Sequence, residues 1–341
     1  MFSKTAVRMR GMALWLFTLA SAGASAGVFV APAIADDETA WRTIDVEARP
    51  VGIGIGENIP DLSRLSYIGG VILSSEDRDF GGFSGLHIDL EGARLEAVSD
   101  KGYWLQADFS FDAARGDIGL ANVQMAPLTD PAGRPLSRKT DADAEGLLVT
   151  GDEALVSFEQ NHRLWRYRRG ANDLYEFISK EDTPADLNGA PSNGGLEAFF
   201  PGENGDLVLM TERLKDETGA LVGWRKSAAG WTALSYRAAS AFSVTDATRL
   251  GDDVIILERA FSPARGVRAR LVSTPKNAFR EGEAVAGEEL ARLGRGAVVD
   301  NFEGVAAVVD EDGRRLIFIM SDDNFNALQR TLLMAFEITA S

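Results

Sequence analysis

Acidic side chains recur along the chain at the same two places of a repeated pattern. A short segment of small and apolar residues carries an acid, and a second apolar segment that ends on another acid follows it. The first segments of four repeats place their acids at Glu145, Glu197, Asp246 and Glu303. Carboxylate oxygens are the ligands that Ca²⁺ and Mg²⁺ prefer in proteins. If the fold brings these acids together, they predict a site for a divalent cation, with Ca²⁺ the expected ion.

The second segments end on acids, and in three repeats a basic residue follows directly. These bases are Lys101, Arg213 and Arg259. Cations beside metal-binding carboxylates suit a phosphoryl group, because Arg donates bidentate hydrogen bonds while a metal takes the remaining oxygen charge. The three bases are therefore candidates for substrate binding. Ordinary salt bridges between neighbouring repeats are the alternative.

The spacing of the repeats indicates the fold. Units about 50 to 60 residues long, each with two or more strand-like segments, are typical of a β-propeller, in which the innermost strands line a central channel. An N-terminal unit from Trp41 to Glu76 raises the expected number of blades to six, each a four-stranded antiparallel sheet. We expect the strand Thr331 to Ile338 to close the ring by pairing with an N-terminal strand. The chief helical candidate is Gly287 to Leu293.

The first 35 residues have the composition of a secretory signal. Lys4, Arg8 and Arg10 precede an apolar stretch, and Ala33-Ile34-Ala35 offers a small-residue cleavage site. We expect general secretory export to the periplasm or the medium, a single domain over residues 36–341, and no membrane span after cleavage. An uncleaved membrane anchor is the alternative.

Charge and composition exclude several classes of protein. Cleavage leaves 32 basic and 51 acidic side chains, a formal charge of −19, with no basic stripe to neutralise the phosphates of a nucleic acid. The chain has no cysteine and only two histidines, His87 and His162, so a zinc site is disfavoured. No Gly-x-Ser-x-Gly elbow supports a serine esterase.

Two further groups of oxygen-bearing side chains are candidate cation ligands. Asp141, Asp143 and Glu145 alternate, so an extended backbone would place all three on one face. The run Ser321 to Asn326 is the other dense group, and neither matches an EF-hand loop. Solvated loops are the alternative explanation for both.

Several of these segments together resemble the bacterial phytase-like family, which is described as having esterase-like activity. The resemblance extends from about Val51 to Ile338 and implies a propeller with recurring acids suspected of hydrolytic work on phosphoesters. The segments are Phe83–Leu86, Ala97–Gly102, Asp143–Leu147, Asn193–Glu197, Leu257–Arg259, Asn301–Gly304 and Ser321–Phe325. The positions that it implicates are Asp100, Glu145, Glu197, Glu258, Glu303, Asp322 and Asp323.

The leading prediction is an exported, metal-dependent phosphoester hydrolase that acts as a monomer on a small anionic or ester substrate. Glu145, Glu197 and Glu303 would hold the cation, and Arg213 and Arg259, with Lys101, would bind the substrate. Asp246 or Asp322 would act as general base, and Glu258 is a further catalytic candidate. A lactonase-like or carboxylic ester hydrolase could use the same metal. A non-catalytic envelope binding or scaffold protein, whose acids only tie the repeats together, is the other alternative.

Overall fold

The computed structural model describes residues 39–56, 60 and 62–339 of the chain, and the predicted signal segment lies outside the described residues. Within them the chain forms twenty-three β-strands, one short α-helix and three 3-10 turns, and the strands make five separate sheets. The all-β prediction is therefore confirmed. None of the helices in this part of the chain is long and apolar enough to cross a membrane.

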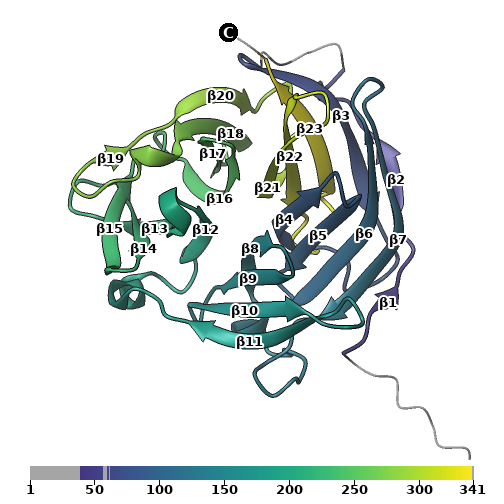
Figure 1. Ribbon diagram of the computed structural model, residues 1–341. Coiled ribbons are helices and arrows are strands. Elements are labelled where there is room, and N and C mark those ends of the chain that lie inside the picture. The colour runs from purple at the N-terminus through teal and green to yellow at the C-terminus, as the bar shows by residue number, and fades with distance from the viewer. Residues whose placement is uncertain (1–38, 57–59, 61, 340–341) are drawn as a thin grey trace, which may run out of the picture. The chain divides into compact units, whose positions relative to one another are not determined.

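The five sheets surround a central axis as the blades of a propeller (Figure 1). Each inner strand contacts the next one around a closed ring. We number the blades I to V in the chain order of their inner strands. These strands are β4 (Phe83–Asp89), β8 (Ala144–Thr150), β12 (Leu196–Pro201), β16 (Ser243–Leu250) and β21 (Asn301–Val309).

The other strands extend each blade outward from its inner strand. Blade I continues through β5 (Arg94–Ser99), β6 (Tyr103–Asp112) and β7 (Asp117–Pro127) to β1 (Arg42–Thr43). Blade II continues through β9 (Glu153–Phe158) and β10 (Arg163–Arg169) to β11 (Tyr175–Glu181). Blade III continues through β13 (Leu207–Lys215), β14 (Leu221–Ser227) and β15 (Gly230–Tyr236) to the parallel strand β19 (Ala284–Val285).

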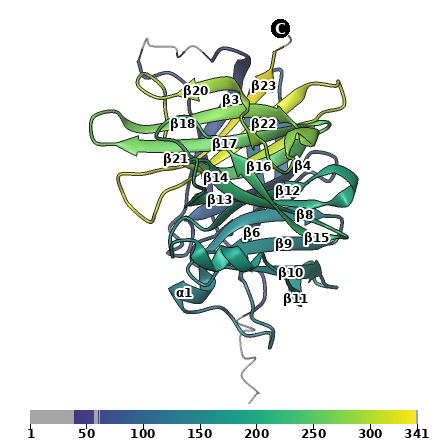
Figure 2. The ribbon, with the colours of Figure 1, turned by 90° about the vertical axis from the view of Figure 1, so that its left-hand side faces the viewer.

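Blade IV continues through β17 (Asp253–Ser262) and β18 (Gly266–Pro275) to β20 (Glu288–Leu293), which are seen as successive strands in Figure 2. Blade V continues through β22 (Arg315–Asp322), β23 (Thr331–Ile338) and β3 (Leu65–Ser74) to β2 (Glu47–Pro50). The helix α1 (Lys139–Ala142) and the turns η1 (Ala185–Gly189), η2 (Glu203–Gly205) and η3 (Lys276–Ala278) lie in the connections.

The prediction of six blades is wrong, because the N-terminal unit does not form a sheet of its own. β1 pairs with β7 in blade I, whereas β2 and β3 join blade V through the pairing of β3 with β23. The predicted closure by the C-terminal strand is confirmed, since Leu333 lies opposite Val71 in that pairing. Two sheets have the four strands predicted and three have five. The expected helix at Gly287 to Leu293 is instead the edge strand β20.

The continuous apolar runs of the middle strands follow from packing on both faces. In β17, Val254 and Ile256 pack in one buried cluster with blade III, while Ile255 and Leu257 pack in another with blade V. Alternate side chains of a strand point to opposite faces. A blade between two neighbours therefore needs apolar residues at consecutive positions rather than at every second one.

A β-bulge interrupts the pairing of every inner strand with its neighbour and is followed by close contact between blades. A side-chain β-carbon on Gly85, next to one bulge, would lie 2.6 Å from the β-carbon of Leu147 in blade II. One on Gly146 would lie 2.5 Å from the Phe199 ring in blade III. Glycine at these positions lets the inner strands approach. The shifts in register fall at Ser84, Glu145, Glu197, Thr245 and Glu303.

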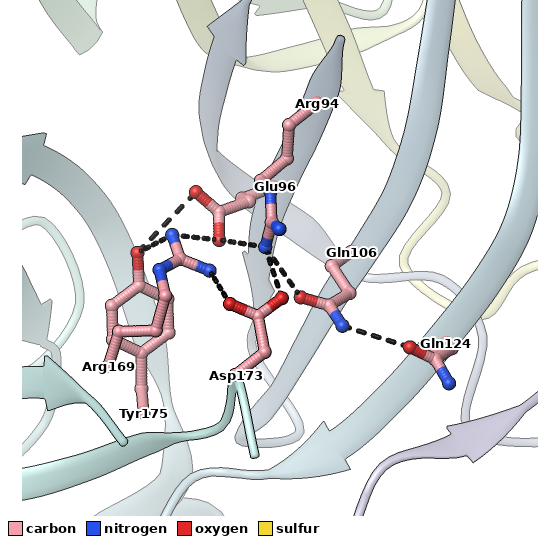
Figure 3. Close-up of polar contacts among 7 residues, drawn as sticks. All are labelled: Arg94, Glu96, Gln106, Gln124, Arg169, Asp173 and Tyr175. Atoms are coloured by element: carbon pink, nitrogen blue, oxygen red, sulfur yellow. Dashed lines mark hydrogen bonds and ion pairs between the residues drawn. The ribbon is translucent and has the colours of Figure 1, made fainter. Parts of the chain in front are cut away.

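Charged side chains between blades I and II form a balanced network around the buried Glu96 (Figure 3). Arg169 donates to Glu96 at 2.8 Å and to Asp173 at 3.1 Å, and Arg94 donates to Asp173 at 2.6 Å. Tyr175 donates its hydroxyl proton to Glu96 at 3.4 Å. Two guanidinium groups thus balance two carboxylates, and this network needs no further ion.

Candidate functional site

A cavity of about 280 Å³ lies where the five inner strands begin. The side chains around it are almost all polar, and carboxylates outnumber cations among the lining residues that the structure describes. The cations are Lys139, Arg213 and Arg259. The carboxylates are Asp100, Asp143, Glu145, Glu159, Glu197, Glu212, Glu303 and Asp322.

We call the five bulge positions the bulge ring: Ser84, Glu145, Glu197, Thr245 and Glu303. All of them except Thr245 line the cavity. A bulge leaves its residue out of the hydrogen-bonded ladder and redirects the side chain. The three glutamates predicted as metal ligands are therefore brought together in one cavity, although they lie about 50 residues or more apart in the chain.

The assignment of Asp246 to this ring is wrong by one residue. The bulge of blade IV falls at Thr245, whose hydroxyl donates to the Phe302 carbonyl at 3.2 Å. Asp246 accepts the backbone N–H of Val305 in blade V at 2.7 Å and that of Ala247 at 2.8 Å. Its carboxylate ties blade IV to blade V and does not line the cavity.

A second ring of side chains comes from the last residues of the second strands or directly after them, and we call it the end ring: Asp100, Glu159, Glu212, Arg259 and Asp322. Each member lies opposite the residue two positions before its blade's bulge. The backbone pairings that show this are Asp100 with Gly82, Glu159 with Asp143, Glu212 with Gly195, Arg259 with Ser243, and Asp322 with Asn301.

The placement of Glu258 in the site is also wrong, and again by one residue. Arg259, not Glu258, occupies the end-ring position of blade IV. Glu258 is fully buried, where it accepts from the Tyr236 hydroxyl at 2.6 Å and from Arg270 at 2.8 Å. It links blades III and IV away from the cavity.

The three predicted substrate-binding cations lie in different surroundings. Arg259 lines the cavity and contacts acids of two blades. Arg213 also lines it, is half-exposed, and pairs with Glu212 at 2.8 Å. Lys101 does not line the cavity, because its ammonium lies 3.4 Å from the centre of the Phe325 ring and donates to the Arg78 carbonyl. Its predicted role in substrate binding is therefore not supported by its position.

Sequence reasoning missed several polar residues of the cavity. Lys139, at the start of α1, lies 3.6 Å from Asp100, and Asn301 lies two residues before the bulge at Glu303. Gln160 follows Glu159 and donates to Asp143. The position of Asn301, two residues before the repeated acid Glu303, could have identified it from the sequence. Lys139 lies before the repeated segment of its blade, and no sequence pattern indicated it.

Each blade has three positions near the cavity: the residue two before the bulge, the bulge residue and the end-ring residue. In blade II all three are acids, whereas every other blade has two acids or fewer at these positions. Asp143, Glu145 and Glu159 each offer an oxygen within 4.8 Å of the others, so this group could hold a metal ion. It includes one of the three predicted ligands, while Glu197 and Glu303 lie elsewhere on the cavity wall. Glu159 also accepts the backbone N–H groups of Gly194 and Gly195, which orients its carboxylate. The all-oxygen donor set fits Ca²⁺ or Mg²⁺.

The electrostatics of the cavity favour bound positive charge. Burial raises the pKa of Glu145 well above its usual range, and the adjacent Glu159 and Asp143 raise it further. Burial likewise raises the pKa of Glu197 well above its usual range, with Glu145 the largest neighbouring contribution. Without a cation these groups hold protons or repel one another. The balanced network between blades I and II shows no such excess.

Arg259 lowers the excess of negative charge on the other side of the cavity. Burial raises the pKa of Glu303 to about 8, and the guanidinium of Arg259 opposes that rise. Burial also raises the pKa of Asp322 to about 7, and the hydrogen bond from the backbone N–H of Asn324 opposes that rise. The cavity therefore has a group of three acids at blade II, with the exposed Lys139 nearby, and another side on which Arg259 partly balances the acids of blades III and V.

The fold and the cavity define a class: a five-bladed β-propeller with a carboxylate-lined cavity at one end of its channel. The family model "Phytase-like: Esterase-like activity of phytase" matches residues 78–325, which include all five inner strands. The chain therefore belongs to the phytase-like family, and the resemblance stated from its motifs is confirmed.

Other comparisons add little to that assignment. No curated protein matches the chain. Among solved structures, an endo-arabinase from Bacteroides thetaiotaomicron is 10% identical, with a TM-score of 0.44, over 77% of this chain and 96% of its own. A PQQ-bound aldose sugar dehydrogenase from Streptomyces coelicolor is 12% identical, with a TM-score of 0.41, over 82% and 99%. Likenesses this distant carry no argument about activity.

Proposed function

We propose that the protein is an exported hydrolase that uses a divalent cation to cleave phosphoesters at the cavity. The family and the fold suggest a hydrolase-type propeller. The observation that carries the rest is the imbalance of charge, since eight carboxylates face three cations around one cavity. A bound divalent cation would balance the excess negative charge that these clustered acids carry when they are ionised.

The residues of blade II would hold the ion. Asp143, Glu145 and Glu159 supply the oxygens, and Gln160 and the Gly194 and Gly195 amides fix two of these carboxylates. A bound Ca²⁺ or Mg²⁺ supplies Lewis acidity toward a phosphoryl oxygen and lowers the pKa of water. Glu197, on the adjacent blade III, adds negative charge near the same position.

Asp322 is the residue best suited to accept a proton from the attacking water. It lines the cavity, and its pKa of about 7 keeps its carboxylate near the balance between proton acceptor and donor at neutral pH. Asn301 and the Asn324 N–H fix its two oxygens at 3.3 and 2.6 Å. Arg213 and Lys139, both exposed at the cavity rim, attract an anionic substrate.

Phosphate release by the calcium-loaded and the metal-stripped protein tests this proposal. We expect turnover of phosphomonoesters with calcium, its loss in chelator, and its loss in Glu145→Gln. The matched control is Glu311→Gln, a change of the same kind at an exposed turn outside the cavity. Undiminished turnover in chelator would refute the metal-dependent scheme.

A neutral carboxylic ester or lactone is the second candidate substrate, for a specific reason. A phosphoester must approach a cavity in which acids outnumber cations, whereas a neutral ester meets no such repulsion. Comparing phosphate release with lactone opening by the same calcium-loaded preparation separates the two. Absence of both, with calcium binding intact, would favour a binding or scaffold protein.

Export is part of the proposal and rests on the first 35 residues of the sequence. Lys4, Arg8 and Arg10 with the apolar stretch after them are typical of a general secretory signal. N-terminal sequencing of protein from the periplasm or the medium should begin at Asp36. Recovery of the uncleaved chain in the cytoplasm would contradict it. Light scattering of the purified protein tests the expected monomer.

A further inference from the structure

Arg259 is the one basic member of the end ring. The equivalent residues of the other four blades are the acids Asp100, Glu159, Glu212 and Asp322. Blade IV also lacks an acid in the bulge ring, where Thr245 stands. A blade of the same architecture thus presents a cation where its neighbours present carboxylates.

The guanidinium of Arg259 joins the two blades on either side of its own. It lies 3.4 Å from Glu212 in blade III and 3.1 Å from Glu303 in blade V, and it also donates to Asn301 of blade V. Asp322 of blade V adds a further negative charge to its surroundings. These partners present only oxygen atoms to the guanidinium, which is the donor set that a hard divalent cation takes.

We propose that Arg259 is a built-in counter-ion that occupies a second cation position of the cavity, so that the protein takes a single divalent ion, at blade II. This deepens the proposed function and rests on it. The chain supplies one positive charge permanently on the side of blades III to V and leaves the acid-only group of Asp143, Glu145 and Glu159 to take the other from solution. Activation by calcium should therefore follow a single-site saturation curve.

Calorimetric titration with calcium chloride tests the number of ions. We expect one ion per chain for the wild type and two for Arg259→Gln, because removal of the guanidinium leaves the oxygens of Glu212, Asn301 and Glu303 without a cation. Arg259→Lys keeps the charge and should still bind one ion. Arg213→Gln, the same change at an exposed rim arginine paired with the same Glu212, should also bind one.

A double variant tests where the second ion binds. Arg259→Gln combined with Glu303→Gln should return to one ion, since the second position loses a ligand while the group at blade II is untouched. If Arg259→Gln is unstable without metal, millimolar calcium should restore its fold, as followed by circular dichroism. A chain that stays unfolded under those conditions would count against the proposal.

The outcomes separate this inference from the proposed function. A wild type that binds one ion, with Arg259→Gln also binding only one, overturns the role of Arg259 and leaves the metal site of blade II standing. A wild type that binds two ions overturns the built-in counter-ion as well. A wild type that binds none removes the metal-dependent function, and this inference with it.

Discussion

The replacement Glu145→Gln gives the sharpest test of the metal site proposed at Asp143, Glu145 and Glu159. The change keeps the shape of the side chain and removes its charge. In the metal-free protein Glu145 is half-buried beside Asp143 and Glu159, which raise its pKa together with burial, so its ionisation opposes folding. We expect the metal-free variant to melt at the same temperature as the metal-free wild type or higher. With calcium the order should reverse, because the variant has lost a ligand.

The size of the calcium effect follows from linkage. An ion that binds only the folded state stabilises it by about 2.7 kcal/mol when its concentration is about 100 times its Kd. Proteins of about 150 to 250 residues gain about 2–4 °C in Tm for each kcal/mol, and larger chains less. The wild type should therefore melt about 5 °C higher with calcium at that ratio, and Glu145→Gln should show little or no shift.

Differential scanning calorimetry in chelator and in calcium chloride measures both effects. The matched control is Glu96→Gln, because Glu96 is also a buried acid but its charge is balanced by Arg169 (Figure 3). Breaking such a buried pair costs about 3–5 kcal/mol. The control should melt lower in both conditions and keep the full calcium shift. An unchanged calcium shift in Glu145→Gln would refute the assignment of this residue as a ligand.

Three further predictions concern the apo protein and the contacts between blades. The metal-free protein should lose stability as the pH rises from about 5 to 8. The pKa values of Asp322, about 7, and Glu303, about 8, are raised in the folded state, which therefore binds more protons than the unfolded state over this range. Urea unfolding that shows rising stability over this range would contradict the prediction. Asp246→Ala should cost about 1–3 kcal/mol in urea unfolding by leaving the Val305 N–H unsatisfied, with the calcium shift intact, and a lost shift would return Asp246 to the site. Gly146→Ala should cost about 1–3 kcal/mol and lower Tm, since its β-carbon meets the next blade; no loss would argue against close contact there.

The number of blades shows a limit of reading repeats from sequence. The segment containing Leu65 has the alternation of a strand, and as a sixth unit it is plausible locally. Its hydrogen-bond partner is β23, more than 250 residues later in the chain, and that pairing closes the ring by adding N-terminal strands to blade V. Local pattern does not encode such a partner, because any exposed strand edge offers the same N–H and C=O groups.

The misplacements in blade IV share one cause. Asp246 and Glu258 matched the repeated acids by residue type, yet the bulge and the strand register place Thr245 and Arg259 at the equivalent positions. A shift of one residue turns a side chain to the other face of a strand. Asp246 therefore bonds the Val305 backbone N–H of blade V, and Glu258 accepts from Tyr236 of blade III and from Arg270 of its own blade.

The β20 segment was predicted as helix for a similar reason. Glu288–Leu293 has good helix formers, but Leu271 of β18 lies opposite Ala291 and offers an open edge of blade IV. Pairing along that edge buries Leu290 and Leu293, which an isolated helix of this length would not do. Tertiary partners thus outweighed local propensity.

The repeat, the all-β class, the family and the gathering of Glu145, Glu197 and Glu303 at one cavity could be predicted from the amino-acid sequence. Strand length, turn chemistry and small residues beside the acids are local properties. The number of blades, the one-residue register of blade IV and the partner of each acid became clear from the three-dimensional structure alone. These depend on ring closure and on neighbouring blades, which bring together residues far apart in the chain. The grouping of Asp143, Glu145 and Glu159 on one side of the cavity and the placement of Arg259 on the other are properties of that arrangement.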